Sequence, residues 1–324
     1  MTASIQLSAS VLAFLEEMRA TLAPHTIELQ LKTSQLPAGS FDPEEFETRH
    51  DDQGNIQIPV WNQAFADFIV VHELIHLQQE RQQIVQIGFV RLEDQQLVQV
   101  LYVISQSLMN TVLHQGMHSQ LKQFELFTER FNLIVQSTFE QELPAETAQS
   151  SHLQIVLTAL QMMDTFTFIG QIPAWRVRYP RSFMLAERMW QLMQDAPLAT
   201  NRHLRHLFLA LNQTLTDYFE STELAAIDLS RDLIVTPVFS DRQLKLDVRQ
   251  LFQLYHVTDS AGLYLGLGRN DQQAAFELRL PKLSDAEQQA KMMGIYQSKI
   301  GSFFEASHLP FAPRDLVIFE RAGD

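Results

Sequence analysis

Hydrophobic residues recur at helical spacing over most of the chain. From residue 91 to residue 235, apolar side chains three and four positions apart predict a succession of helices. Breaks are expected near Gly116, in a polar linker at 141–151 and around an irregular segment at 171–181. This middle part of the chain is therefore predicted to be predominantly α-helical.

The first sixty residues and the last ninety show weaker patterns. Alternating apolar and polar residues over 26–32 predict a half-buried strand, and 45–50 with 55–60 suggest a hairpin around a turn. Pro59 would place the last of these strands at a sheet edge. Near the end of the chain, 262–280 is expected to form a second small hairpin before a last helix at 284–306. The expected fold is mainly α (α+β), with a small N-terminal antiparallel sheet.

The segment 68–77, Phe-Ile-Val-Val-His-Glu-Leu-Ile-His-Leu, is an apolar helix interrupted by three polar side chains. His72 and His76 are spaced i, i+4 and therefore share one helix face. This is the H-E-x-x-H arrangement, in which both histidines bind zinc and Glu73 acts as general base. A helix that is apolar nearly all round is buried, and unpaired buried polar groups cost about 1–3 kcal/mol each. The pattern favours a metal site over a satisfied pair of core histidines.

Composition narrows the chemistry of such a site. The 324 residues contain no cysteine, so the ligands of any metal must be His, Asp or Glu. The formal net charge of −14 argues against nucleic acid or an anionic membrane surface as the main partner. We see no signal peptide and no apolar run of about 18 residues, so a soluble, cytoplasmic protein without an integral membrane segment is expected.

The third zinc ligand is expected to be Glu223. This carboxylate falls within the apolar stripe of a helix predicted from 201 to 235, where it would be costly unless it is paired or bound to a metal. Other candidates are interpreted as surface, core or ion-paired residues: His114 and His118, His203 and His206, Glu125 and Glu129.

Three segments in order resemble the zinc metallopeptidase family of the CAAX prenyl endopeptidase and the bacterial heat-shock membrane protease. They are His72–His76, a segment from Glu223 to Leu229 similar to the family's E-x-x-A-D, and a segment from His308 to Arg314 similar to its H-P-x-x-x-x-R. The resemblance implies that Glu223 is the third zinc ligand of a gluzincin-type site. It also implies that His308 and Arg314 line the cleft, with His308 helping to hold the oxyanion.

The match to this family is incomplete. Ile227 stands where the family has an aspartate, and Asp228 follows one position later. Leu309 separates His308 from Pro310, whereas the family's histidine and proline are adjacent. The transmembrane helices of the family are missing.

Together these patterns predict a zincin-like metallopeptidase core formed by residues 1–90 and 201–324, with 91–200 as a helical insertion. The expected activity is zinc-dependent endopeptidase cleavage of a peptide or protein substrate. One alternative is a zinc-stabilised binding or chaperone-like module without catalytic turnover. The other is a helical di-iron protein in which Glu73-x-x-His76 and Glu305-x-x-His308 form the two half-motifs.

Overall fold

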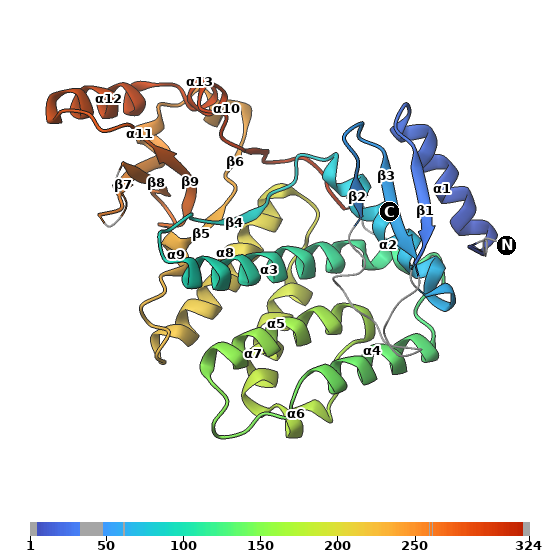
Figure 1. The fold of residues 1–324 in the computed structure, drawn as a ribbon. Helices are drawn as coiled ribbons and strands as arrows, with labels where there is room; N and C mark the ends of the chain where they lie inside the picture. Colours follow the sequence, from blue (N-terminus) through green and yellow to red (C-terminus); the bar gives the residue numbers. More distant parts are fainter. Residues whose placement is uncertain (1–4, 33–47, 61, 259, 261, 320–324) are drawn as a thin grey trace.

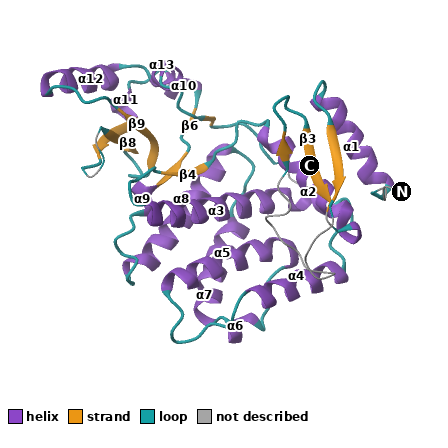
Figure 2. Cartoon of the chain, in the orientation of Figure 1, coloured by secondary structure: helices purple, strands orange, loops and turns teal. Residues whose placement is uncertain are grey.

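The protein is described by a computed structural model covering residues 5–32, 48–60, 62–258, 260 and 262–319. It is mainly helical with several small sheets, as Figures 1 and 2 show. The longer helices are α1 (Ala9–Leu22), α2 (Ala66–Glu80), α3 (Gln95–Lys122), α4 (Glu129–Glu142), α5 (His152–Ile169), α7 (Pro180–Asp195), α8 (Asn201–Glu220) and α12 (Asp285–Gln297). Shorter helices are η2 (Gln63–Phe65), α6 (Trp175–Arg178), α9 (Leu229–Asp232), α10 (Asp241–Leu244), α11 (Val248–Leu251) and α13 (Ile300–Ala306).

The N-terminal sheet is mixed rather than antiparallel. Its order is β1 (Ile27–Leu31), β3 (Ile56–Val60), β2 (Arg49–His50); β1 runs parallel to β3, and β2 runs antiparallel to it. Residues 45–47 of the expected hairpin lie outside the described part of the chain, but β2 and β3 pair as predicted. The edge position expected for the strand of Pro59 is wrong, because β3 is the central strand. Pro59 is tolerated there because β2 pairs only with Ile56 and Gln57. Asn62 caps the short η2 turn that leads into α2, accepting a hydrogen bond from the Ala64 amide.

The other sheets lie later in the chain. β4 (Ile87–Phe89) pairs with β5 (Leu233–Val235), and β6 (Val238–Phe239) pairs with β10 (Ala312–Pro313). A three-stranded antiparallel sheet consists of β7 (Phe252–His256), β8 (Leu263–Gly268) and β9 (Ala274–Arg279). The hairpin expected over 262–280 is thus confirmed as β8–β9. The last predicted helix is divided into α12 and α13.

In the view of Figure 1, α3 crosses the middle of the molecule, and the other helices of 91–200 lie below it. The largest hydrophobic core joins α3, α5, α7 and α8, with α5 packed against both α3 and α7. This core crosses residue 200, where the sequence suggested a domain boundary. A second core links α1, the N-terminal sheet and α2 to the end of α3. Within the described residues, no helix combines the length and hydrophobicity needed to cross a membrane.

Gly116 does not divide α3, which continues for another turn and a half to Lys122. Its role is steric. A Cβ atom on Gly116 would lie 2.2 Å from the ring of Phe319, so the glycine allows the end of the described chain to pack on the helix. The segment 312–319 reaches this point by pairing with β6 and then bridging Val317 to Thr200 at the start of α8.

Candidate metal centre

Three imidazoles from two helices meet at the junction of α2, α3 and α5. His72 and His76 lie one turn apart on α2, and His114 faces them from α3. The Nε2 atom of His114 is 3.0 Å from Nε2 of His72 and 3.3 Å from Nε2 of His76. One possible metal-ligating nitrogen from each of these three residues lies within 4.8 Å of the other two. We call this group the histidine junction.

The donor set fits zinc. Two nitrogen ligands at about 2.0–2.1 Å from a tetrahedral ion stand about 3.3 Å apart. The Nε2–Nε2 distances of 3.0 and 3.3 Å are close to that value. Three histidines and one open position are also the ligand set of a known class of catalytic zinc sites. The side chains therefore converge as they would around one small divalent cation.

Two of the histidines are held from behind by carboxylates. Nδ1 of His72 lies 2.9 Å from Oε1 of Glu73, and Nδ1 of His114 lies 2.6 Å from Oδ1 of Asp164 on α5. The second oxygen of Glu73 accepts a hydrogen bond from the Thr48 hydroxyl. Because an ionised carboxylate only accepts, both Nδ1 atoms carry the hydrogen and both Nε2 atoms present lone pairs to the centre. Glu73 thus lies on the Nδ1 side of His72, away from the converging Nε2 atoms.

The protonation state of His76 also suits metal binding. Burial lowers the pKa of His76 well below its usual value of 6.5, and the neighbouring His72 and His114 lower it further. The neutral form, which a metal requires, is therefore the stable one. Gln79, one turn along α2, is 6% exposed and opposes this shift slightly. Its amide makes no hydrogen bond of normal geometry with the described residues.

Aromatic rings border the junction on one side. The Phe168 ring is 4.9 Å from the His114 ring and 6.3 Å from that of His72, and Phe68 stacks on His72 at 5.6 Å. Phe127 is next to Phe168, at 6.4 Å, and stacks on His118. Phe127 and Phe168 are half-buried, so apolar surface lies beside the imidazoles.

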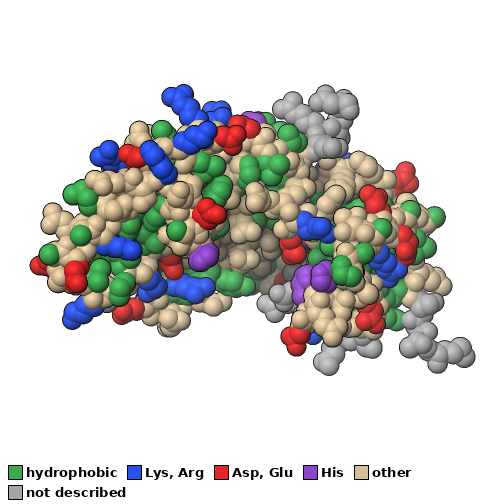
Figure 3. Space-filling view, turned by 90° about the horizontal axis from the view of Figure 1, so that it is seen from above, with side chains coloured by type: hydrophobic (Ala, Val, Ile, Leu, Met, Phe, Trp, Pro, Cys, Tyr) green, Lys and Arg blue, Asp and Glu red, His purple; other side chains and the backbone are tan. Residues whose placement is uncertain are grey.

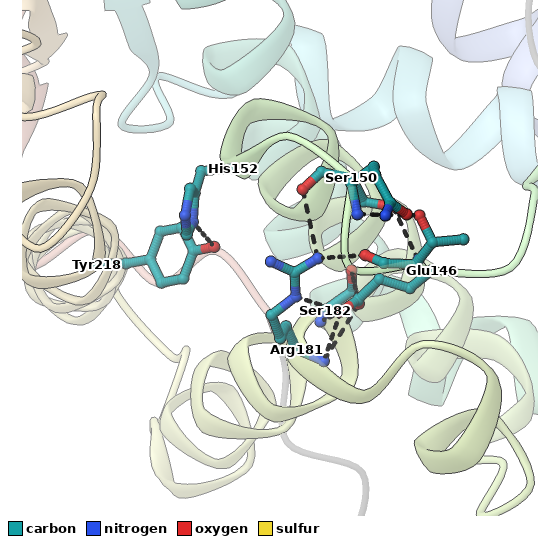
Figure 4. A network of polar contacts seen from close by, with 8 residues as sticks. Glu146, Ser150, His152, Arg181, Ser182 and Tyr218 are labelled. Atoms are coloured by element: carbon teal, nitrogen blue, oxygen red, sulfur yellow. Dashed lines mark hydrogen bonds and ion pairs between the residues drawn. The ribbon is translucent and has the colours of Figure 1, made fainter.

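Glu223 lies elsewhere, so the structure does not bring the expected third ligand to the histidines. α8 ends at Glu220, and Glu223 follows in a turn with its side chain 59% exposed. It lies 3.6 Å from Nε2 of His152, at the first residue of α5. Asp164, twelve residues further along α5, is about 18 Å away along the helix axis. Figure 4 shows His152 with its partner Tyr218, near the buried Glu146 and Arg181.

The C-terminal residues of the resemblance are also separate from the junction. His308 is exposed just after α13, with a positive φ of 52°. Arg314 forms an ion pair with the adjacent Asp315, and its backbone amide bonds to Phe239 in β6. In Figure 1, α13 lies at the upper left with the other C-terminal elements, well apart from α2 to the right of centre. Glu305 and His308 consequently do not complete a di-iron site with Glu73 and His76.

Sequence reasoning set His114 aside as a surface or core histidine and did not consider Asp164, although a signal for both was present. His114 follows Leu108 and Val112 within the buried side of α3, and Asp164 is flanked by buried residues of α5. A polar side chain in an apolar stripe was the argument for Glu223, and it applies equally to these two. Their distance of 50 residues along the chain concealed that they are partners.

The sequence and structure were compared with known proteins. No family model matches the chain, and no curated protein or solved structure does so either.

Proposed function

We propose that this chain is a zinc-dependent hydrolase whose metal is held by His72, His76 and His114, and that its substrates are peptides. One observation carries the proposal. Nε2 of His72 and Nε2 of His114 are 3.0 Å apart, and each imidazole has its hydrogen committed to a carboxylate on the other side of the ring. Two lone pairs facing each other at that distance are repulsive unless a cation lies between them.

Zinc with three histidine ligands and one open position lowers the pKa of its water ligand towards about 7 and polarises a carbonyl group. The chain's own residues would hold and orient the site. Glu73 and Asp164 fix the ring orientation of His72 and His114 through Nδ1. With both oxygens of Glu73 already accepting hydrogen bonds, its contacts favour a positioning role over that of general base.

Two features support peptides as the class of substrate. The H-E-x-x-H motif is typical of metallopeptidases, and the half-buried Phe127 and Phe168 offer an apolar surface for a side chain next to the metal. We expect substrates with a large apolar residue close to the cleaved bond.

A second candidate is a metal-stabilised binding module without turnover. The engagement of Glu73 with His72 and Thr48 is the observation in its favour, because this removes the proton acceptor that H-E-x-x-H enzymes use. Both candidates require the same metal, and they differ only in catalysis.

The test is zinc content and peptide cleavage measured on the purified chain and on His114→Ala. We expect one zinc per chain, cleavage of an unbiased peptide library at apolar residues, and loss of both metal and cleavage in the variant. His25→Ala, which alters an exposed histidine in the N-terminal region, is the control and should retain both. A zinc-loaded chain that cleaves no peptide would favour the binding module. A chain that takes up no stoichiometric zinc would refute both candidates.

A further inference from the structure

The side chains around the three imidazoles indicate the charge of the metal ion that the site would bind. This inference rests on the proposed metal site and concerns the residues behind the ligands. Two histidines have a carboxylate behind them, Glu73 at His72 and Asp164 at His114, and Gln79 lies one turn from His76 on α2. Two of these side chains are anions, and the third is a neutral amide.

We propose that Glu73 and Asp164 are positioning residues that hold the Nε2 atoms of His72 and His114 towards the centre, and that their two negative charges match the site to a single divalent cation. Three neutral imidazoles contribute no charge, so the two carboxylates and one divalent ion sum to zero. A buried cluster that is electrically neutral avoids the large penalty of an uncompensated charge away from water.

The burial of these groups makes charge balance important. Glu73 is 6% exposed and His114 is 8% exposed, so neither is effectively screened by solvent. The Asp164 side chain is 33% exposed, and its Oδ2 atom makes no hydrogen bond with the described residues. Asp164 is therefore the member of the set that can be changed with the least disturbance of packing.

The same arrangement explains the polarity of the Gln79 position. Gln79 follows His76 by three residues and His72 by seven, so its side chain extends from the same face of α2. It is buried without a hydrogen bond of normal geometry among the described residues. A carboxylate here would give the site a third negative charge, whereas an amide can accept a hydrogen bond from Nδ1 without adding one.

The main experiment compares the wild-type chain, Asp164→Asn and Glu73→Gln by two measurements. The first is the Kd for Zn²⁺ from competition with a chromophoric chelator. We expect each variant to bind zinc about 10–100-fold more weakly, as is typical when a partner of a ligating histidine is lost. Asp195→Asn removes an exposed charge from α7 and should leave the Kd unchanged.

The second measurement is the ¹⁵N chemical shift of the imidazoles in the metal-free protein. In the wild-type chain, His72 and His114 should carry hydrogen on Nδ1. Asp164→Asn should alter this pattern at His114 while leaving His72 in place. A destabilised fold would broaden all the signals, so this readout separates positioning from general structural damage.

Gln79→Glu tests the charge argument directly. The third carboxylate should raise the affinity for a trivalent lanthanide by a larger factor than any change in the affinity for Zn²⁺. Equal changes for the two ions would overturn the charge-matching proposal. An unchanged Kd for Zn²⁺ in both Asp164→Asn and Glu73→Gln would overturn the positioning role. Absence of zinc binding by the wild-type chain would instead refute the proposed function itself.

Discussion

Two interior regions of this molecule differ in the side chains they bury, since one is apolar and aromatic and the other is polar and ionisable. The C-terminal module, formed by the elements from β6 to α13, is centred on aromatic rings: Phe239, Phe252, Phe276, Phe303 and Phe304. The histidine junction is largely buried but contains imidazoles and carboxylates. The aromatic core is complete when its apolar surfaces meet, whereas the junction leaves lone pairs that the described chain does not satisfy.

The surface charge differs between the same two parts of the chain. Residues 1–236 carry 14 Lys and Arg against 27 Asp and Glu, while residues 237–324 carry 10 against 11. On the face drawn in Figure 3, Lys and Arg side chains are most abundant over the half formed by the C-terminal elements. The acidic excess therefore belongs to the part that contains the histidine junction. An acidic surface raises the local concentration of cations.

The largest expected effect is in the aromatic core. Phe304 is fully buried against five other phenylalanine rings, so Phe304→Ala should cost about 3–5 kcal/mol of unfolding free energy. The loss should be the same with zinc and with a chelator, because no metal ligand lies in this core. Urea unfolding measures it, and Met293→Ala, at a half-exposed position on α12, is the control. A loss that changes markedly on adding zinc would show that the two regions are coupled.

Glu146 is a buried anion whose partners all come from the chain. Its side chain is 4% exposed and accepts hydrogen bonds from the backbone amides of Arg181 and Ser182, from the Arg181 guanidinium and from the Ser182 hydroxyl (Figure 4). Burial raises the pKa of Glu146, but these hydrogen bonds outweigh it and lower the pKa.

Glu146→Ala should destabilise the protein by about 1–3 kcal/mol, because it leaves buried donors at the start of α7 unpaired. The effect should be independent of zinc, unlike changes at the histidine junction. Thermal or urea unfolding with and without a chelator provides the measurement. Glu187→Ala breaks the more exposed pair with Arg176 and should cost less than about 1 kcal/mol. Equal losses in the two variants would contradict the importance of the buried network.

Asp232 is a partly buried carboxylate whose hydrogen bonds do not offset the cost of burial. Burial raises its pKa to about 6, and the charge of Asp228 adds to the effect, although the Asp228 amide and Arg231 oppose it. The folded protein therefore holds this proton to a higher pH than the unfolded chain, whose aspartates titrate near 3.8.

It follows that the contribution of Asp232 to stability should fall as the pH rises from about 4 to about 6, and then stay level. Asp232→Asn should remove this part of the pH dependence while leaving the rest of the profile unchanged. Unfolding free energies measured between pH 4 and pH 7 test the prediction. The exposed Asp195→Asn should reproduce the wild-type profile; an identical slope in Asp232→Asn would count against the assignment.

The local elements were largely determined by the sequence. Apolar periodicity predicted α2 and the succession of helices from α3 to α8, and turn signals predicted the hairpin of β8 and β9. These signals are local, because side chains three or four apart on a helix, or two apart on a strand, share one face. The prediction of a break at Gly116 was wrong. A glycine within a helical pattern can mark either a break or a close contact, and here it allows the close contact with Phe319.

The sequence by itself also determined that His72, Glu73 and His76 lie on one buried helix. Which residue would join them was decided only by the tertiary structure. Glu223 fulfilled every local criterion, but its helix ends at Glu220 and its side chain pairs with His152. His114 and Asp164 meet because α5 packs against α3, a contact between surfaces far apart in the chain. Local patterns record which faces are buried, while the partner of each face depends on how the whole chain packs.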